Sequence, residues 1–519
     1  MLLHLALLFG ALTQRIICPI VEVNTIHVLA SWGLLDAVLL FLLVRTNSST
    51  TAVISSFAGI NFVYFSSLIV TTVIYRLYFH PLRHLPGHKI AAASKLHEAY
   101  LNASGQFSFN TRALHKLYGP VIRTGPNHVS ITSLSALRLL IPTPNHRQRG
   151  PTNEIGKLFG DGSGNVATTR DNNQHKLWRP TWEKAFTRGR VTEYAPRVEK
   201  HVEQFVCVLR GTKGAEVDAN ARVGDFTFDV MSDLGFGVDE GLQFGGGNRE
   251  YNDFFKSFLR TAAIMGSLRN LVDILQFAPH DKYMRKFVAL TENMIAKRLE
   301  IGSRRNDVFT NVLKGPFSRA QMAANAMLLI AAGSDTTSSV LTNTLRELAM
   351  HPEWQEKVLK EVREHDGAVN VQATNSMPVV CAVVDESLRL WNPIPAGVES
   401  IVPPGGITID GVFLPPYTVA RAHHLTVMTG ISSLPSHHHR HCANLSIESH
   451  RPQILPPRRG LASQPLARRQ GDARPRAQSV HPILVWCAFV RRKADGPERA
   501  APRRRPRGVG VRDRDRRWI

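Results

Sequence analysis

The sequence predicts a mainly α-helical fold with a small β part, preceded by apolar segments at the start of the chain. Three observations lead to this prediction. Apolar residues recur at helical spacing from Ser318 to His351, alternating apolar residues form only a few short runs, and residues 52–75 are almost free of charge. With 519 residues, of which 43% are hydrophobic, the chain is long enough for one large domain with a substantial core.

The basic charge of the chain is concentrated near its end. The net charge is +22, which would usually indicate nucleic acid or an anionic membrane surface as a partner. From Arg421 to Ile519, however, the chain has 20 arginines, one lysine and six acidic residues, so this part carries +15 of the +22. The five cysteines show no pairing spacing, which argues against a disulfide framework and fits a reducing compartment: Cys18, Cys207, Cys381, Cys442 and Cys487.

Residues 1–76 have the composition of a membrane anchor. Residues 52–75 are long enough to span a bilayer, residues 28–44 are marginal because they contain Asp36, and residues 1–12 are apolar but short. A cleaved signal peptide is the alternative for residues 1–12, although a basic start and a clear cleavage site are missing. We therefore expect one to three transmembrane segments.

Basic residues follow the last apolar segment. Arg76, Arg83, Lys89 and Lys95 lie on its C-terminal side, so the positive-inside rule predicts that the rest of the chain is cytosolic. Two short strands with a turn are expected within residues 118–131.

A cationic and aromatic cluster opens a helical run within residues 173–182. His175, Trp178 and Arg179 belong to it, and arginine and histidine suit carboxylates through charge-assisted hydrogen bonds. The alternative is a basic patch on the protein surface.

The long helix carries unusual polar residues at its middle. Ser318 and Gln321 form a capping box at its start, and Pro352 ends it after His351. Residues 331–339 read Ala-Ala-Gly-Ser-Asp-Thr-Thr-Ser-Ser, which lowers helix propensity and lets hydroxyls bond to the preceding turn. We expect a local opening and a groove where a small molecule and protons meet. A polar patch in a core or transmembrane helix is the alternative.

A second helix is expected to start at Pro378 and to place Glu386 and Arg389 on one face. Further along, Pro403-Pro404-Gly405-Gly406 precedes alternating apolar residues around Asp410-Gly411, a pattern that predicts a hairpin.

The central helix and the Glu-x-x-Arg helix about fifty residues later resemble those of the cytochrome P-450 enzymes, the haem-thiolate monooxygenases, in particular fungal microsomal ones. The resemblance runs to about residue 420. It implies a catalytic domain at 77–420, haem as cofactor, and electrons from NADPH through an NADPH-cytochrome reductase. It also implies a small organic substrate, no nucleic acid, and an endoplasmic reticulum membrane location with the catalytic domain cytosolic.

The resemblance assigns roles to individual residues. Asp335 and Thr336 would pass protons to the bound dioxygen, and Ala332, Gly333 and Thr337 would contact the haem. Glu386 and Arg389 would stabilise the core beneath the haem. The propionates would be bound by His175, Trp178 and Arg179. One departure is Glu399, which stands near where the family often has a basic residue facing a propionate.

The haem-ligand cysteine motif of the family, Phe-x-x-Gly-x-Arg-x-Cys-x-Gly, is missing from the printed chain. Cys442 and Cys487 lack its glycines, so we expect an inactive protein with no metal ligand identified and an arginine-rich, disordered tail at 421–519. Zinc binding by the histidines at 437–441 lacks a second ligand pair at finger spacing. Two other classes stay open: a catalytically dead membrane protein, and a basic membrane-surface or nucleic-acid-binding protein.

The tail also fits a shifted reading frame or a retained intron. A shift of one nucleotide forward turns the codons of Trp486-Cys487, TGG-TGY, into an obligatory glycine codon. The codons from Ile483 to Lys493 then permit the whole cysteine motif with every spacing kept. An excess of arginine over lysine is also what GC-rich DNA gives in a wrong frame.

Overall fold

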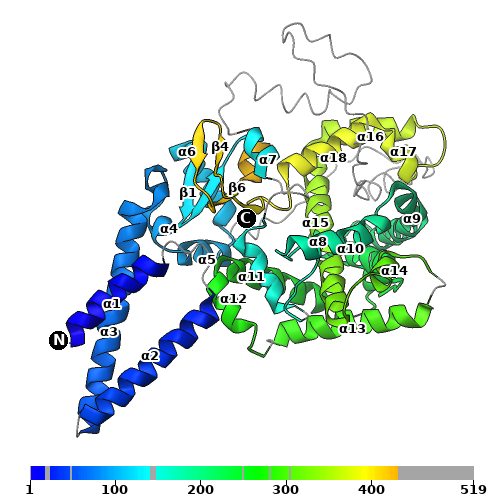
Figure 1. Ribbon diagram of the computed structural model, residues 1–519. Helices are drawn as coiled ribbons and strands as arrows, with labels where there is room; N and C mark the ends of the chain where they lie inside the picture. The colour runs from blue at the N-terminus through cyan, green and yellow to red at the C-terminus, as the bar shows by residue number, and fades with distance from the viewer. Residues whose placement is uncertain are drawn as a thin grey trace. The chain divides into compact units, whose positions relative to one another are not determined.

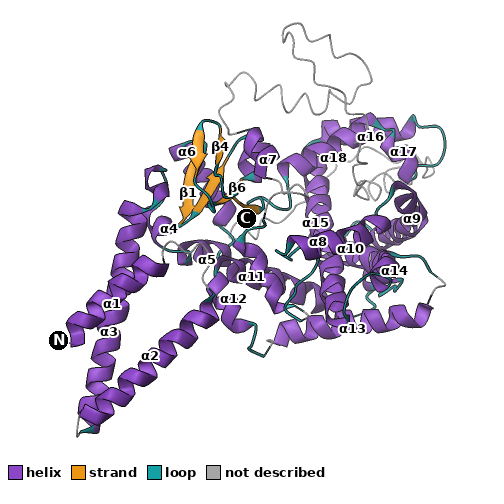
Figure 2. Ribbon diagram, in the orientation of Figure 1, coloured by secondary structure: helices purple, strands orange, loops and turns teal. Residues whose placement is uncertain are grey.

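The computed structural model describes residues 2–17, 24–46, 49–140, 148–159, 161–247, 250–279, 282–302 and 305–430. The chain divides into two compact units. The first comprises Met1–Asn172, Phe258–Asp281 and Ala396–Val427, and the second is built mainly from Asn173–Ser257 and Lys282–Pro395. Helices predominate and strands are few, which confirms the predicted fold class (Figure 2).

Three apolar helices begin the first unit: α1 (Leu2–Ile17), α2 (Thr25–Thr46) and α3 (Thr50–Ile74) (Figure 1). Two helical segments, Thr25–Thr46 and Thr50–Phe79, are long and apolar enough to cross a membrane, whereas α1 has only 16 residues. The end of the second segment is a π-helical turn, η1 (Tyr75–Phe79), followed by η2 (Pro81–His84).

The rest of the first unit surrounds a small sheet. Its helical elements are α4 (Lys89–Ala93), α5 (Leu96–Ala103), α6 (Phe107–Tyr118), α7 (Leu134–Leu140), η3 (Pro151–Leu158) and α12 (Arg269–Leu275). Its strands are β1 (Val121–Gly125), β2 (His128–Ile131), β3 (Glu399–Ile401), β4 (Ile407–Ile409), β5 (Val412–Leu414) and β6 (Val419–Ala422). The four-stranded sheet has the order β1-β2-β6-β3, in which only β2 and β6 run parallel.

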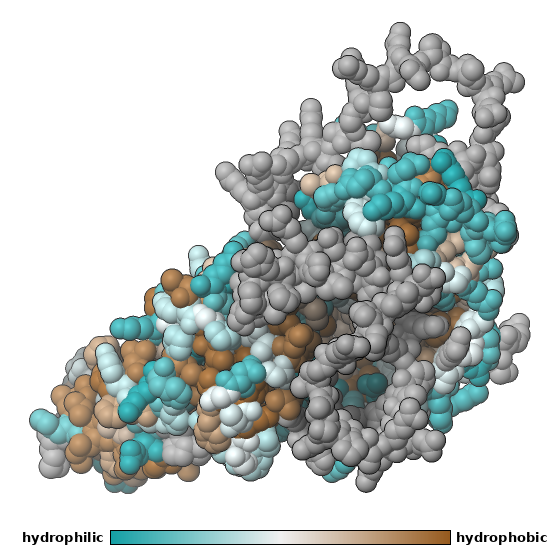
Figure 3. Space-filling model, turned by 90° about the horizontal axis from the view of Figure 1, so that it is seen from above, coloured by the Kyte–Doolittle hydropathy of each residue, from teal (hydrophilic) through white to brown (hydrophobic). Residues whose placement is uncertain are grey.

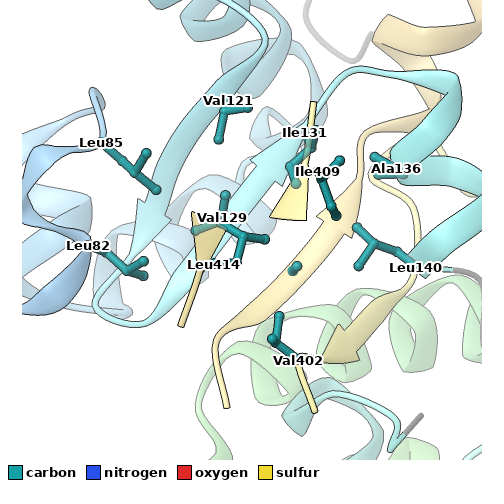
Figure 4. Packing of buried hydrophobic residues seen from close by; sticks show 12 residues of the cluster. Leu82, Leu85, Val121, Val129, Ile131, Ala136, Leu140, Val402, Ile409 and Leu414 are labelled. Atoms are coloured by element: carbon teal, nitrogen blue, oxygen red, sulfur yellow. The ribbon is translucent and has the colours of Figure 1, made fainter. Parts of the chain in front are cut away.

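The predicted hairpin is β4 and β5, paired antiparallel across Asp410 and Gly411. Both turn residues have positive φ, 49° and 80°, as the favoured two-residue hairpin turn requires. Apolar side chains from this hairpin and from the sheet form one buried cluster, in which Ile131, Leu414 and Leu82 are fully buried (Figure 4).

The second unit is helical. Its elements are α8 (Asn172–Ala185), α9 (Arg188–Gly211), α10 (Ala219–Phe236), η4 (Leu242–Phe244), α13 (Lys282–Ile301), α14 (Val308–Leu313), α15 (Arg319–Met350), α16 (Pro352–Arg363), α17 (Val371–Asn375) and α18 (Pro378–Leu390). Helix α11 (Glu250–Ser267) is shared between the units. The capping box of α15 at Ser318 and Gln321 and its end at His351 are as predicted.

The folded part of the chain continues beyond residue 420, where we expected the catalytic domain to stop. Strand β6 extends to Ala422, and a short helix, α19 (His424–Met428), follows it. Arg421, counted above with the arginine-rich tail, is therefore a residue of the sheet. Cys442, Cys487 and the histidines at 437–441 lie outside the described residues.

Candidate active site

Helix α15 carries the polar stretch without interruption. It is helical from Arg319 to Met350, so the local opening expected at Gly333 is not present. A Cβ at Gly333 would lie 2.5 Å from Met231 Sδ and 2.9 Å from Met231 Cγ, because the Met231 side chain of α10 packs against this glycine. Gly333 therefore allows close packing of α10 and α15.

The other face of α15 holds the two predicted catalytic residues. The Thr336 hydroxyl donates a hydrogen bond of 2.6 Å to the carbonyl oxygen of Ala332, one turn earlier, and Ala332 is exposed. Asp335 and Thr337 are half-buried. Ser334 points away from this face, since it is buried with its Oγ 3.2 Å from Thr227 Oγ1 of α10. An exposed carbonyl, a hydroxyl and a carboxylate thus lie within two turns.

The predicted pair on α18 is present. Arg389 donates to Glu386 through Nε (2.8 Å) and Nη2 (2.6 Å), a bidentate arrangement that is partly buried. A further donor of Arg389, Nη1, bonds to the carbonyl oxygen of Met428. The pair thus connects α18 to the end of α19.

The cluster on α8 is only partly exposed. Trp178 is buried, and its ring packs 5.4 Å from that of Phe317, whereas His175 is half-buried. Arg179 is exposed and pairs with Glu183 at 3.0 Å. An exposed pair of this kind is weak, so the Arg179 guanidinium can exchange Glu183 for the carboxylate of a ligand.

Glu399 belongs to a buried charge network that the sequence did not reveal. It lies directly opposite Arg421 in the pairing of β3 with β6 and forms an ion pair with it. Arg421 also bonds to Glu98 Oε1 at 3.0 Å, and the backbone N–H of Thr152 donates to Glu399 Oε2 at 3.0 Å. Burial alone would raise the pKa of Glu399, but the charges of Arg421 and Lys95, together with the hydrogen bond from Thr152, outweigh it and hold this pKa well below its usual range.

A neutral histidine completes the buried charge network. Burial lowers the pKa of His128 to about 3, with Lys95 adding to the effect. His128 Nε2 lies 3.7 Å from Glu399 Oε1, but a neutral imidazole makes this contact a dipolar one and not an ion pair. The Glu399 carboxylate is thus already paired with Arg421 of the neighbouring strand.

Neither of the two cysteines that the structure describes fits a thiolate ligand. Cys207 is exposed on α9. The Cys381 thiol donates to the carbonyl oxygen of Thr374 at 3.5 Å, and burial raises its pKa, so it stays protonated. Within the described part of the chain, there is also no group of three or more His, Cys, Asp or Glu side chains that could hold a metal ion.

Haem therefore fits these residues only in part. Arg179 is an available cation for a propionate, and the face of Ala332 and Thr336 is open to a small molecule. Glu399 does not fit a propionate, and no proximal ligand is found among the described cysteines. Sequence patterns did not predict the roles of Met231 and Arg421, because the residues that they contact are far away in the sequence.

The fold is mainly helical with a small sheet, and α15 and α18 carry the two motifs of the candidate site. Residues 96–424 match the family model described as Cytochrome P-450. The chain is 30% identical to Cytochrome P-450 67 of Uromyces fabae over 388 residues, 71% of this chain and 70% of that protein. It is 28% identical to the averantin hydroxylase of Dothistroma septosporum over 364 residues, 67% and 68% of the two chains.

A third relative, the fusicoccadiene 8-ol C-16 hydroxylase of Alternaria brassicicola, is 27% identical over 379 residues, 67% of this chain and 74% of that protein. The chain belongs to the cytochrome P-450 family, and its fungal relatives are monooxygenases and hydroxylases. Membership implies haem as the cofactor and a small organic substrate.

Proposed function

We propose that this protein derives from a haem-dependent monooxygenase of fungal secondary or xenobiotic metabolism, and that the chain as printed is inactive. The intact enzyme inserts one oxygen atom from dioxygen into an organic substrate and releases the other as water. The observation that carries the proposal is the open face of α15, where the Thr336 hydroxyl is fixed one turn above Ala332 and next to Asp335.

The residues of this chain have distinct tasks in that reaction. Haem, when bound, supplies the redox chemistry. The Thr336 hydroxyl proton is held on the Ala332 carbonyl, so the lone pairs of its oxygen can accept a proton donor in the groove. The Asp335 carboxylate lies next to it in the sequence and can bring protons from solvent. Arg179 and His175 would hold the haem propionates by charge-assisted hydrogen bonds.

The setting we propose is the endoplasmic reticulum membrane, with residues 1–76 as the anchor and the catalytic domain in the cytosol. Two apolar helical segments and the basic residues Arg76, Arg83 and Lys89 that follow them support this. Electrons would come from NADPH through a membrane-bound reductase on the same side. A protein that starts near Tyr78 should leave the integral membrane fraction, whereas resistance to alkaline carbonate extraction would reveal a further membrane segment.

Haem content tests the function. Purified full-length protein, assayed as the pyridine haemochrome, should hold less than one equivalent of haem. This amount should fall several-fold in Arg179→Leu and stay unchanged in Arg190→Leu, a control whose arginine is also paired on the surface of the second unit. Complete absence of haem would favour the catalytically dead alternative. Deleting residues 431–519 should leave membrane binding unchanged, and loss of binding would favour the basic-tail alternative.

A further inference from the structure

The N-terminal end of α2 is attached to the folded body of the first unit. The Thr25 hydroxyl donates a hydrogen bond of 2.9 Å to Asp273 Oδ2 of α12. The other oxygen of Asp273 accepts a hydrogen bond of 2.6 Å from Lys157 Nζ of η3, and Asp273 itself is buried. Because α12 and η3 belong to the body, the start of α2 must lie on the same side of a membrane as the body.

The C-terminal end of α3 is connected directly to the body of the first unit, because the chain continues from it into that body. It continues into η1, and Arg123 of the sheet donates a hydrogen bond of 2.8 Å from Nη1 to the carbonyl oxygen of Arg76. The two membrane-crossing segments thus have one end each at the body, and their other ends are joined by the few residues between Thr46 and Thr50.

Side chains near the middle of the two helices also contact each other. Asn61 Nδ2 donates a hydrogen bond of 3.2 Å to Asp36 Oδ1, and the rings of Trp32 and Phe65 lie 5.1 Å apart in an edge-on arrangement. Because residue 36 lies beside residue 61 and residue 32 beside residue 65, α2 and α3 run antiparallel, as in a helical hairpin. Asp36 and Asn61 lie at the middle of their helices, where an acidic side chain needs a partner.

Helix α1 packs against the body-proximal half of α3. Ser67 Oγ donates a hydrogen bond of 2.7 Å to the carbonyl oxygen of Leu7, and a Cβ at Gly10 would lie 2.8 Å from Ser67 Cβ. Tyr64 OH lies 3.2 Å from Thr13 Oγ1. With 16 residues, α1 is about 24 Å long, which is shorter than the hydrocarbon core of about 30 Å. Seen from above, apolar residues gather at the left, where these helices lie (Figure 3).

We infer that α2 and α3 cross the membrane as a hairpin whose two ends lie on the side of the body, and that α1 does not cross. The inference rests on the membrane attachment proposed above. The chain then crosses twice, and Asp273 is the docking site that holds the start of α2, so the body is held to the membrane at two points. Arg45 lies near the far tip, while Arg76, Arg83 and Lys89 lie at and after the end of α3 on the body side, as the positive-inside rule favours.

Glycosylation mapping in microsomes tests the hairpin. Acceptor sequences within flexible glycine-serine spacers are placed ahead of Leu2, between Thr46 and Ser49, and after Ile519 of the full chain. The natural acceptor sequences at Asn47, Asn102 and Asn444 are first removed by Asn→Gln substitutions. Protease protection of epitope tags at the same three places provides a second measurement that does not depend on the glycosylating enzyme.

The hairpin predicts that the two terminal sites are either both glycosylated or both unmodified, and that the site between Thr46 and Ser49 shows the opposite result. If only the tip is glycosylated, the hairpin and the cytosolic body are both supported. If both ends are modified and the tip is not, the hairpin stands while the proposed cytosolic orientation is wrong. An N-terminal site that differs from the C-terminal one means an odd number of crossings and overturns the inference, because then either α1 crosses the membrane or α2 does not. Extraction by alkaline carbonate would instead overturn the membrane attachment itself.

Discussion

Arg421 has a structural role that its position in an arginine-rich segment conceals. It is 6% exposed and pairs with two buried carboxylates, Glu98 and Glu399, the first of which also pairs with Lys95. Such a network is costly to break because the remaining charges stay buried without compensation. We therefore regard the sheet of the first unit as dependent on one guanidinium.

The substitution Arg421→Met tests this dependence. Methionine keeps much of the volume but leaves Glu98 and Glu399 close together, so we expect a loss of about 3–5 kcal/mol. Arg179→Met removes an exposed pair and should cost less than about 1 kcal/mol. Unfolding of the detergent-solubilised full chain measures both, and equal effects of the two substitutions would contradict the assigned role.

Buried histidines of the first unit predict acid sensitivity. Burial lowers the pKa of His115 to about 4 and of His128 and His423 to about 3. In the unfolded chain these groups bind protons below their ordinary pKa of 6.5, whereas the folded state does not. The unfolded state therefore gains protons, and stability should fall as the pH drops from about 6.5 towards 4.

Melting temperature measured against pH shows this effect. The slope between pH 6.5 and 4 should be smaller in His423→Asn and unchanged in His351→Gln, since His351 is exposed. The depressed pKa values of Glu98 and Glu399 add a further loss at lower pH, in the same direction. A melting temperature that rises on acidification would contradict the account.

At the scale of the elements, features that depend on nearby residues in the sequence were predicted correctly, whereas a feature that depends on a tertiary contact was not. The caps of α15, the start of α18 at Pro378 and the hairpin at Asp410-Gly411 depend on neighbours a few residues away, and all are confirmed. The opening at Gly333 was wrong because Met231 of α10 packs there, and such a neighbour leaves no trace near residue 333.

The packing of α10 on α15 can be tested by a pair of substitutions. Gly333→Ala should destabilise by about 1–3 kcal/mol through overpacking, and Met231→Ala by about 2–5 kcal/mol through a cavity. In the double variant the new methyl group fills part of the cavity, so the combined loss should be clearly smaller than the sum. Gly189→Ala, in an open helical position, should be neutral or stabilising. Additive losses would show that the two side chains do not compete for one space.

At the scale of the whole molecule, the sequence predicted the mainly helical fold, because apolar residues recur at helical spacing, whereas the anchor and the roles of Asp335 and Thr336 stay predictions. It could not predict the end of the folded part, since β6 and α19 follow a boundary drawn from the family resemblance at about residue 420. The match to the family stops at residue 424, before any cysteine motif. The missing proximal ligand is therefore the main departure of the printed chain from its family.

A shifted reading frame would restore that ligand. We expect transcripts to show a spliced or corrected frame across codons 415–519 that encodes Phe-x-x-Gly-x-Arg-x-Cys-x-Gly from the codons of Ile483 to Lys493. The sequence of the transcript decides this directly. A continuous, spliced frame that encodes the printed tail would rule the explanation out and leave the catalytically dead protein.

The ferrous-CO spectrum tests the central claim most directly, that residues up to Met428 belong to a P-450 oxygenase and that the printed chain lacks its proximal ligand. It is recorded for the printed chain and for the chain with the frame shifted at Ile483, both purified after haem supplementation. We predict no thiolate-ligated spectrum for the printed chain and a thiolate-ligated spectrum for the shifted one. A thiolate spectrum from the printed chain would make Cys442 or Cys487 the ligand and contradict the account, as would its absence from a folded, haem-containing shifted chain.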